Sequence, residues 1–122
     1  DMAWHTITEP FEGDVEQFEV ASMAPTQVLP VVPGTAMAPA FGHIFSGGYA
    51  AGYYGYKWAE VLEADAFSLF KEKGIFNREV SGSFRENILS KGGTEHPMEL
   101  YVRFRGHKPE TRALIEKMGL GK

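Results

Sequence analysis

The chain has 122 residues, enough for about one domain, and a formal net charge of −4. Residues 1–40 contain six acids and no base, and residues 77–122 contain nine bases and six acids, which excludes the clustered basic excess of a nucleic-acid surface. Because the chain has no cysteine, disulfides, thiolate nucleophiles and cysteine-based zinc sites are excluded too.

The N-terminal forty residues are predicted to hold two helical segments and a loop. Residues 1–8 are partly apolar, and we expect the tail of a helix that begins upstream, because a chain that starts with aspartate is interpreted as a fragment of a longer protein. Asp14 is a good N-cap for a helix over 15–24, which Pro25 ends. Three further prolines predict a loop over 26–40.

No Asp, Glu, Lys or Arg occurs between Glu19 and Lys57, so this long segment is uncharged. Four of the chain's 7 prolines fall inside it, which excludes one continuous helix and therefore a membrane helix. Its second half, residues 41–56, is rich in glycine and tyrosine and contains a single histidine, His43. This composition is typical of a flexible segment that lines a binding site and offers uncharged hydrogen-bond donors to a ligand.

The remainder of the chain is predicted to be helical. Apolar residues at spacings of 3, 4 and 7 indicate a long helix over about 50–71, with Gly74 as its stop. Asn77 and Thr94 are the predicted caps of the next two helices. Three shorter helices are expected in all, over 77–89, 95–104 and about 109–119. Since no alternating strand pattern competes with these helices, we expect an all-α fold with one long proline- and glycine-rich loop.

The uncharged segment offers neutral hydrogen-bond donors. Tyr49, Tyr53 and Tyr56 stand at i, i+4 and i+7 and would share one face if the segment were helical, with His43 just upstream. A neutral phenol can stabilise negative charge that develops on a carbonyl oxygen. The pair Gly47–Gly48 would let main-chain N–H groups approach a bound peptide. The alternative is that an aromatic stripe at helical spacing belongs to the core.

Asp65 and the other histidines have simpler interpretations. Asp65 interrupts the apolar stripe of the long helix, so it is either a buried acid that pairs with a base or a residue at the edge of the stripe. His5, His96 and His107 are scattered, with no second histidine three or four positions away that would build a helical metal site, and we expect them on the surface. We therefore assign no metal ligand in this chain.

The segment 42–62, GHIFSGGYAAGYYGYKWAEVL, resembles the C-terminal catalytic part of the thimet oligopeptidase family of zinc metallopeptidases. The resemblance covers essentially all 122 residues, including the stretches 1–6, 23–27, 29–30, 65–67, 74–77, 88–93 and 104–106. Within the family it looks most like the bacterial peptidyl-dipeptidase branch, which removes C-terminal dipeptides from peptides. The resemblance implies that residues 1–122 are the C-terminal helical part of a larger catalytic domain.

The resemblance also implies a zinc ion in the parent protein. In this family the ligands are two histidines of a His-Glu-x-x-His helix and a downstream glutamate, and that motif does not occur in this sequence. The ligands are thus expected upstream. The isolated chain is expected to bind no zinc tightly and to cleave nothing.

The roles of the site residues follow from the same resemblance. It implies that His43 and Tyr49 contact the peptide backbone near the scissile bond, and that Tyr56 donates to the oxyanion of the tetrahedral intermediate. Tyr53 would line the same wall. Gly47 and Gly48 would belong to a mobile loop that closes over the substrate.

The expected partners are short peptide substrates and the rest of the catalytic domain, and no nucleic acid or membrane. No signal-peptide pattern is present, and we expect the cytoplasm, with the periplasm as an alternative. Two alternative functions stay open: an oligopeptidase of the same family, or a non-catalytic helical module that uses its uncharged segment as an apolar contact surface. A His-Glu-x-x-His motif upstream of the chain would decide for the peptidase.

Overall fold

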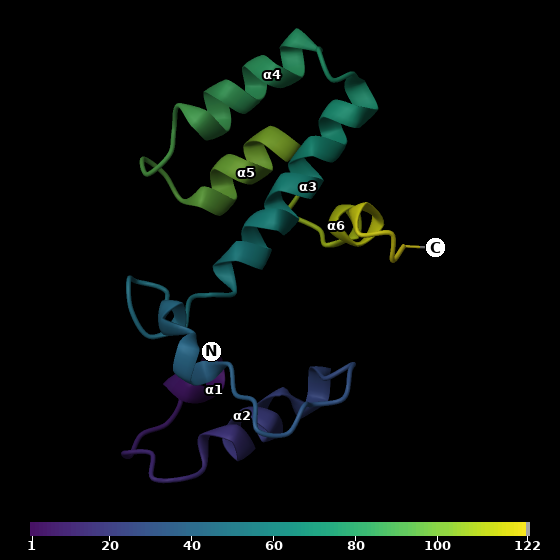
Figure 1. The fold of residues 1–122 in the computed structure, drawn as a ribbon. Helices are drawn as coiled ribbons and strands as arrows, with labels where there is room; N and C mark the ends of the chain where they lie inside the picture. Colours follow the sequence, from purple (N-terminus) through teal and green to yellow (C-terminus); the bar gives the residue numbers. More distant parts are fainter. Residues whose placement is uncertain (122) are drawn as a thin grey trace. The chain divides into compact units, whose positions relative to one another are not determined.

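The computed structural model describes residues 1–121, and within that range it contains helices, turns and loops but no strand (Figure 1). The all-α prediction is therefore confirmed. The chain divides into two compact units, Asp1–Gly55 and a second unit from Tyr56 onward. Among the described residues no helix combines the length and the apolar character that crossing a membrane requires.

The first unit contains two α-helices and three short 3-10 turns. Their bounds are α1 (Met2–His5), α2 (Val15–Met23), η1 (Ala24–Thr26), η2 (Ala38–Ala40) and η3 (Gly42–Ile44). The side chain of Asp14 accepts a hydrogen bond from the Gln17 amide at 2.9 Å, as an N-cap does. The predicted cap and helix are confirmed, and α2 gives way to a 3-10 turn at Pro25.

An aromatic cluster packs α1 against α2. The ring of Trp4 lies 4.3 Å from that of Phe18 and 5.1 Å from that of Phe11, measured between centroids, and Phe45 joins it at 6.2 Å. Because Phe45 follows η3, the cluster ties the uncharged segment to the N-terminal helices. Ring pairs at such separations add to the stabilisation from burial.

Two glutamates of α2 hold the proline-rich loop. Glu16 accepts a hydrogen bond from the Gly34 amide at 2.8 Å. The carboxylate of Glu19 accepts from the amides of Met37 and Ala38 at 2.8 and 2.6 Å. Backbone donors that have no helical or strand partner need such acceptors. The loop predicted over 26–40 is confirmed, since its only regular pieces are the last residue of η1 and the short 3-10 turn η2.

The second unit is a small helical assembly. Its elements are α3 (Gly55–Lys73), α4 (Arg78–Phe84), the π-helical turn η4 (Arg85–Leu89), α5 (Pro97–Arg105) and α6 (Arg112–Lys117). In Figure 1, α5 lies against α3 and against the helix formed by α4 and η4. The predicted order and number of these helices are confirmed.

The caps of the second unit agree with the sequence in part. Gly74 has a φ of 107° directly after α3, and the Asn77 side chain accepts from two amides at the start of α4. The predicted cap at Thr94 is wrong, because His96 Nδ1 accepts from the Met98 amide at 3.2 Å. Thr94 instead donates its hydroxyl to the Lys91 carbonyl at 2.8 Å.

The core of the second unit includes the apolar stripe that the sequence predicts for the long helix. Its side chains come from α3, the α4–η4 helix and α5, and they are Leu62, Ala66, Leu69, Phe70, Val80, Phe84, Ile88, Tyr101 and Phe104. Phe84 and Phe104 make the closest ring pair among these, with centroids 5.1 Å apart. The packing fixes α3, whose first turn carries Tyr56.

Candidate functional site

Three of the predicted site residues gather in the first unit. The ring of His43 lies 4.5 Å from that of Tyr49 and 5.8 Å from that of Tyr53, between centroids. The rings of Phe41 and Tyr53 form a T-shaped pair with centroids 4.9 Å apart. The structure thus brings together an imidazole and two phenols that are up to ten positions apart in sequence. Imidazole and phenol groups can both donate and accept hydrogen bonds.

The three tyrosines do not share a helical face. Helix α3 begins at Gly55 rather than near Ala50, so Tyr49 and Tyr53 lie before it, while Tyr56 stands in its first turn. The shared-face expectation is therefore wrong, because glycines and a left-handed alanine interrupt the helix. Tyr53 and Tyr56 are 37% and 44% exposed, so neither belongs to a buried core.

A tight turn precedes the tyrosines. The carbonyl of Gly42 accepts hydrogen bonds from the amides of Phe45 and Ser46 at 3.0 and 2.9 Å, and from the Ser46 hydroxyl at 3.0 Å. Gly47 and Gly48 follow with φ angles of 74° and 85°, a conformation that residues with a Cβ rarely adopt. These two glycines turn the chain between His43 and Tyr49.

Replacing Gly48 by alanine is expected to destabilise the first unit by about 1 to 2 kcal/mol, because its φ is positive. A Cβ at Gly48 meets no atom within 4 Å, so the cost would be purely conformational. Gly42→Ala is the matched control: it is equally uncrowded but has no positive φ. Urea unfolding of both variants checks the prediction, and equal free energies of unfolding would contradict it.

The side chain of Asp1 contacts the turn between Tyr49 and Tyr53. Its Oδ1 accepts from the Ala51 amide at 3.0 Å and its Oδ2 from the Tyr53 amide at 2.9 Å. His5 Nδ1 lies 2.9 Å from Asp1 Oδ1, and its side chain is only 21% exposed, so the expectation of a surface histidine is wrong here. The sequence offered only the i, i+4 spacing of this pair as a signal.

Asp65 is a buried acid in the second unit, as one of the two sequence interpretations expected. It is 3% exposed, and its Oδ2 accepts from the Tyr101 hydroxyl at 2.6 Å. The guanidinium of Arg105 lies 3.6 Å from Asp65 Oδ1 and also donates to the Asp65 carbonyl. Burial, and next the hydrogen bond to Asp65, raise the pKa of the Tyr101 phenol well above its usual range. This group joins α3 to α5.

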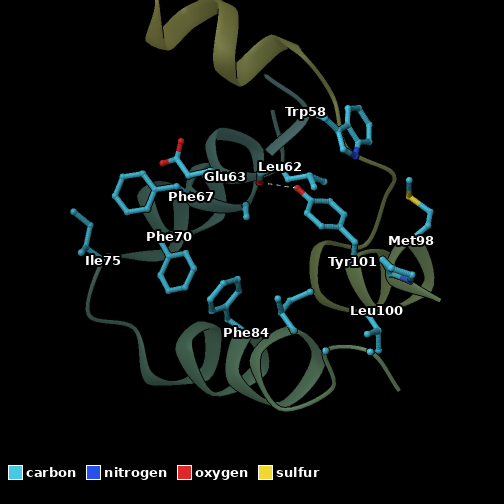
Figure 2. Close-up of a pocket in the computed structure, with 15 residues that line it drawn as sticks. Trp58, Leu62, Glu63, Phe67, Phe70, Ile75, Phe84, Met98, Leu100 and Tyr101 are labelled. Atoms are coloured by element: carbon cyan, nitrogen blue, oxygen red, sulfur yellow. Dashed lines mark hydrogen bonds between the residues drawn. The ribbon is translucent and has the colours of Figure 1, made fainter. Parts of the chain in front are cut away.

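An apolar cavity of about 690 Å³ opens beside this group (Figure 2). Figure 2 shows Phe70, Phe84 and Tyr101 pointing into it from α3, α4 and α5. Trp58 and Met98 lie at its border. None of the predicted site residues lines it.

The zinc that the resemblance implies has no set of ligands in the described part of the chain. Within residues 1–121 no three side chains of His, Cys, Asp or Glu are grouped so that they could hold a metal ion. The residues present therefore do not fit a zinc site.

The sequence matches known proteins along nearly its whole length. The model of peptidase family M3 matches residues 1–120. The oligopeptidase A of Escherichia coli is 63% identical over 81 residues, which cover 66% of this chain and 12% of that protein. A probable cytosolic oligopeptidase A of Arabidopsis thaliana is 48% identical over 125 residues, covering 98% of this chain and 18% of that protein.

A second group of relatives carries a different name. The dipeptidyl carboxypeptidase of Escherichia coli is 41% identical over 122 residues, which cover 98% of this chain and 18% of that protein. The chain thus spans less than a fifth of the length of each of these three relatives.

Proposed function

The chain belongs to peptidase family M3, a family of zinc metallopeptidases, and we propose that it is part of an enzyme that hydrolyses short peptides. The observation that carries the proposal is the match of the family model to residues 1–120. In the parent enzyme this chain supplies contacts to the substrate and to the transition state. The zinc is held by ligands in another part of the parent.

The neutral donors of the site have distinct roles in this proposal. His43 and Tyr49 bind the peptide backbone beside the scissile bond, and Tyr53 lines the same wall. When water adds to the scissile carbonyl, its oxygen gains negative charge, and the Tyr56 hydroxyl donates a hydrogen bond to it. The ring contacts of His43 with Tyr49 and Tyr53, and the exposure of Tyr53 and Tyr56, support these roles.

Gly47 and Gly48 contribute through their backbone. Both are exposed and adopt positive φ angles, so their backbone N–H groups are not covered by side chains of their own. In the proposal this part of the uncharged segment closes over the bound peptide and places main-chain N–H groups beside it.

Between the two cleavage modes, we favour internal cleavage by an oligopeptidase over the release of C-terminal dipeptides. The comparison at equal coverage supports this choice: with 98% of the chain covered, identity is 48% to the plant oligopeptidase A and 41% to the dipeptidyl carboxypeptidase. Dipeptide release, the first expectation from the sequence, is the second candidate because that relative also matches nearly the whole chain.

The products of a short peptide distinguish the two modes. The full-length enzyme is expected to cleave internal bonds, and to do so equally well when the C-terminal carboxylate is amidated. Mass spectrometry of the products checks this. Successive dipeptides formed only from the free-acid peptide would instead establish the dipeptidase mode. A purified, zinc-loaded enzyme that hydrolyses neither peptide would contradict the proposed function itself.

The proposed partners of the chain are short peptides and the rest of the catalytic domain. The apolar cavity beside Tyr101 supports the second partner, because an apolar surface of this kind is normally covered in the complete protein. We propose the cytoplasm as the compartment, with the periplasm as the alternative, and cell fractionation tests this choice. One plant relative is itself named a probable cytosolic enzyme.

A further inference from the structure

We propose that Asp1 and His5 are positioning residues that fix the turn carrying Tyr49 and Tyr53. The contacts that Asp1 and His5 make are seen within the first unit, whereas their effect on catalysis rests on the proposed function. Neither residue is expected to touch the substrate, so both act through the backbone of the turn.

The carboxylate of Asp1 binds two backbone donors of this turn at once. Oδ1 accepts from the amide of Ala51 at 3.0 Å, and Oδ2 accepts from the amide of Tyr53 at 2.9 Å. The two amides are 50 and 52 positions away in sequence. The Asp1 side chain is only 13% exposed, so water competes weakly for these bonds. A carboxylate with two oxygens matches two neighbouring N–H groups.

The turn needs such a partner because its backbone is strained. Ala51 has a φ of 55° and is the sole non-glycine residue with positive φ in the described chain. This left-handed conformation is unfavourable for a residue with a Cβ and persists where surrounding contacts hold it. One of the two amides bound by Asp1 is that of Ala51 itself. The aspartate therefore stabilises the left-handed conformation of Ala51 in the turn between Tyr49 and Tyr53.

His5 holds the carboxylate in place. Helix α1 puts His5 one turn after Asp1, so that its Nδ1 lies 2.9 Å from both Asp1 Oδ1 and the Asp1 carbonyl oxygen. Its ring also packs 5.7 Å from that of Phe45, between centroids. The Asp1 side chain is thereby anchored to the aromatic cluster of Trp4 and Phe45. The turn, α1 and the cluster form one connected support for the phenols.

The test compares two Asp→Asn variants in the full-length enzyme. In Asp1→Asn one carboxylate oxygen becomes an amide nitrogen, so one of the two turn amides faces a donor instead of an acceptor. Asp14→Asn is the matched control, because Asp14 also accepts from a backbone amide, that of Gln17 at 2.9 Å, but at the start of α2.

Two readouts are needed. Hydrogen exchange of the peptide covering 49–54 is expected to become about tenfold faster in Asp1→Asn, while exchange in α2 and α5 stays unchanged. The same variant is expected to lose about tenfold in kcat with little change in KM, because small displacements of catalytic donors are costly. Asp14→Asn is expected to change neither quantity at this site.

Each outcome decides the proposal. Unchanged exchange over 49–54 in Asp1→Asn would overturn it, and so would faster exchange there with wild-type kcat. Equal loss of kcat in both variants would show a general effect on stability and would overturn it too. If the wild-type enzyme hydrolysed no peptide, the proposed function would fail, but the exchange result would still decide whether Asp1 fixes the turn.

Discussion

Replacing Tyr56 by phenylalanine in the full-length enzyme is expected to lower kcat about a hundredfold while KM changes little. The hydroxyl is proposed to donate only to charge that develops in the transition state, so its loss leaves the bound substrate unaffected. The phenylalanine ring preserves the shape of the first turn of α3. An effect on kcat alone would therefore report the missing hydrogen bond.

Steady-state kinetics with one short peptide measures this effect. Tyr54→Phe is the matched control, since Tyr54 is two positions away, is 66% exposed and has no proposed role. Its kcat and KM are expected to stay at wild-type values. A higher KM with unchanged kcat in Tyr56→Phe would remove Tyr56 from the oxyanion role and make it an ordinary substrate contact.

Replacing Tyr101 by phenylalanine is expected to lower the free energy of unfolding by about 2 kcal/mol at neutral pH. The ring of Tyr101 stays packed in the core, but the buried Asp65 carboxylate loses the donor at 2.6 Å. Arg105 lies 3.6 Å from the other oxygen and compensates only in part. Urea unfolding followed by helical circular dichroism measures the loss.

The loss should shrink in alkaline solution. Because the pKa of Tyr101 is raised in the folded chain, the unfolded chain releases the phenolic proton above about pH 10 while the folded chain retains it. The stability that Tyr101 contributes is therefore complete at neutral pH and falls as the pH rises past about 10. The difference in free energy of unfolding between the wild type and Tyr101→Phe should be smaller at about pH 11 than at about pH 8. An equal difference at both pH values would contradict the account.

Local signals made the helices of the second unit predictable. The apolar stripe of α3, the Asn77 cap and the stop at Gly74 all act within one or two helical turns, so the residues near them suffice. The cap of α5 also had a local signal: Pro97 favours the first helical position, which makes His96 the N-cap. Threonine is a common N-cap residue, but here the proline places the cap directly before itself.

The uncharged segment was less predictable, because its conformation depends on distant contacts. Residues 50–54 have helix-compatible spacing, but Ala51 adopts a left-handed conformation and its amide binds Asp1 from the other end of the first unit. Likewise, Asp65 finds Tyr101 and Arg105 36 and 40 positions away. Pairing over such distances leaves no periodic trace in the sequence.

The composition of the uncharged segment indicated the residues of the candidate site, and the family resemblance supplied their roles. Spacing alone predicted a shared helical face for the tyrosines, which the start of α3 at Gly55 contradicts. The composition of the uncharged segment already singled out His43 and Tyr49, the resemblance gave them roles, and the structure places their rings 4.5 Å apart. The catalytic roles of these residues and of Tyr56 stay predictions.

The central claim is that neutral phenols of the uncharged segment stabilise the charged oxygen of the transition state. The affinity of a phosphinic peptide, whose tetrahedral centre mimics that state, tests it most directly. Tyr56→Phe is expected to weaken this inhibitor about a hundredfold, in proportion to its loss of kcat/KM, while a substrate-like peptide binds as it does to wild type. Equal inhibitor affinity for wild type and Tyr56→Phe would contradict the claim.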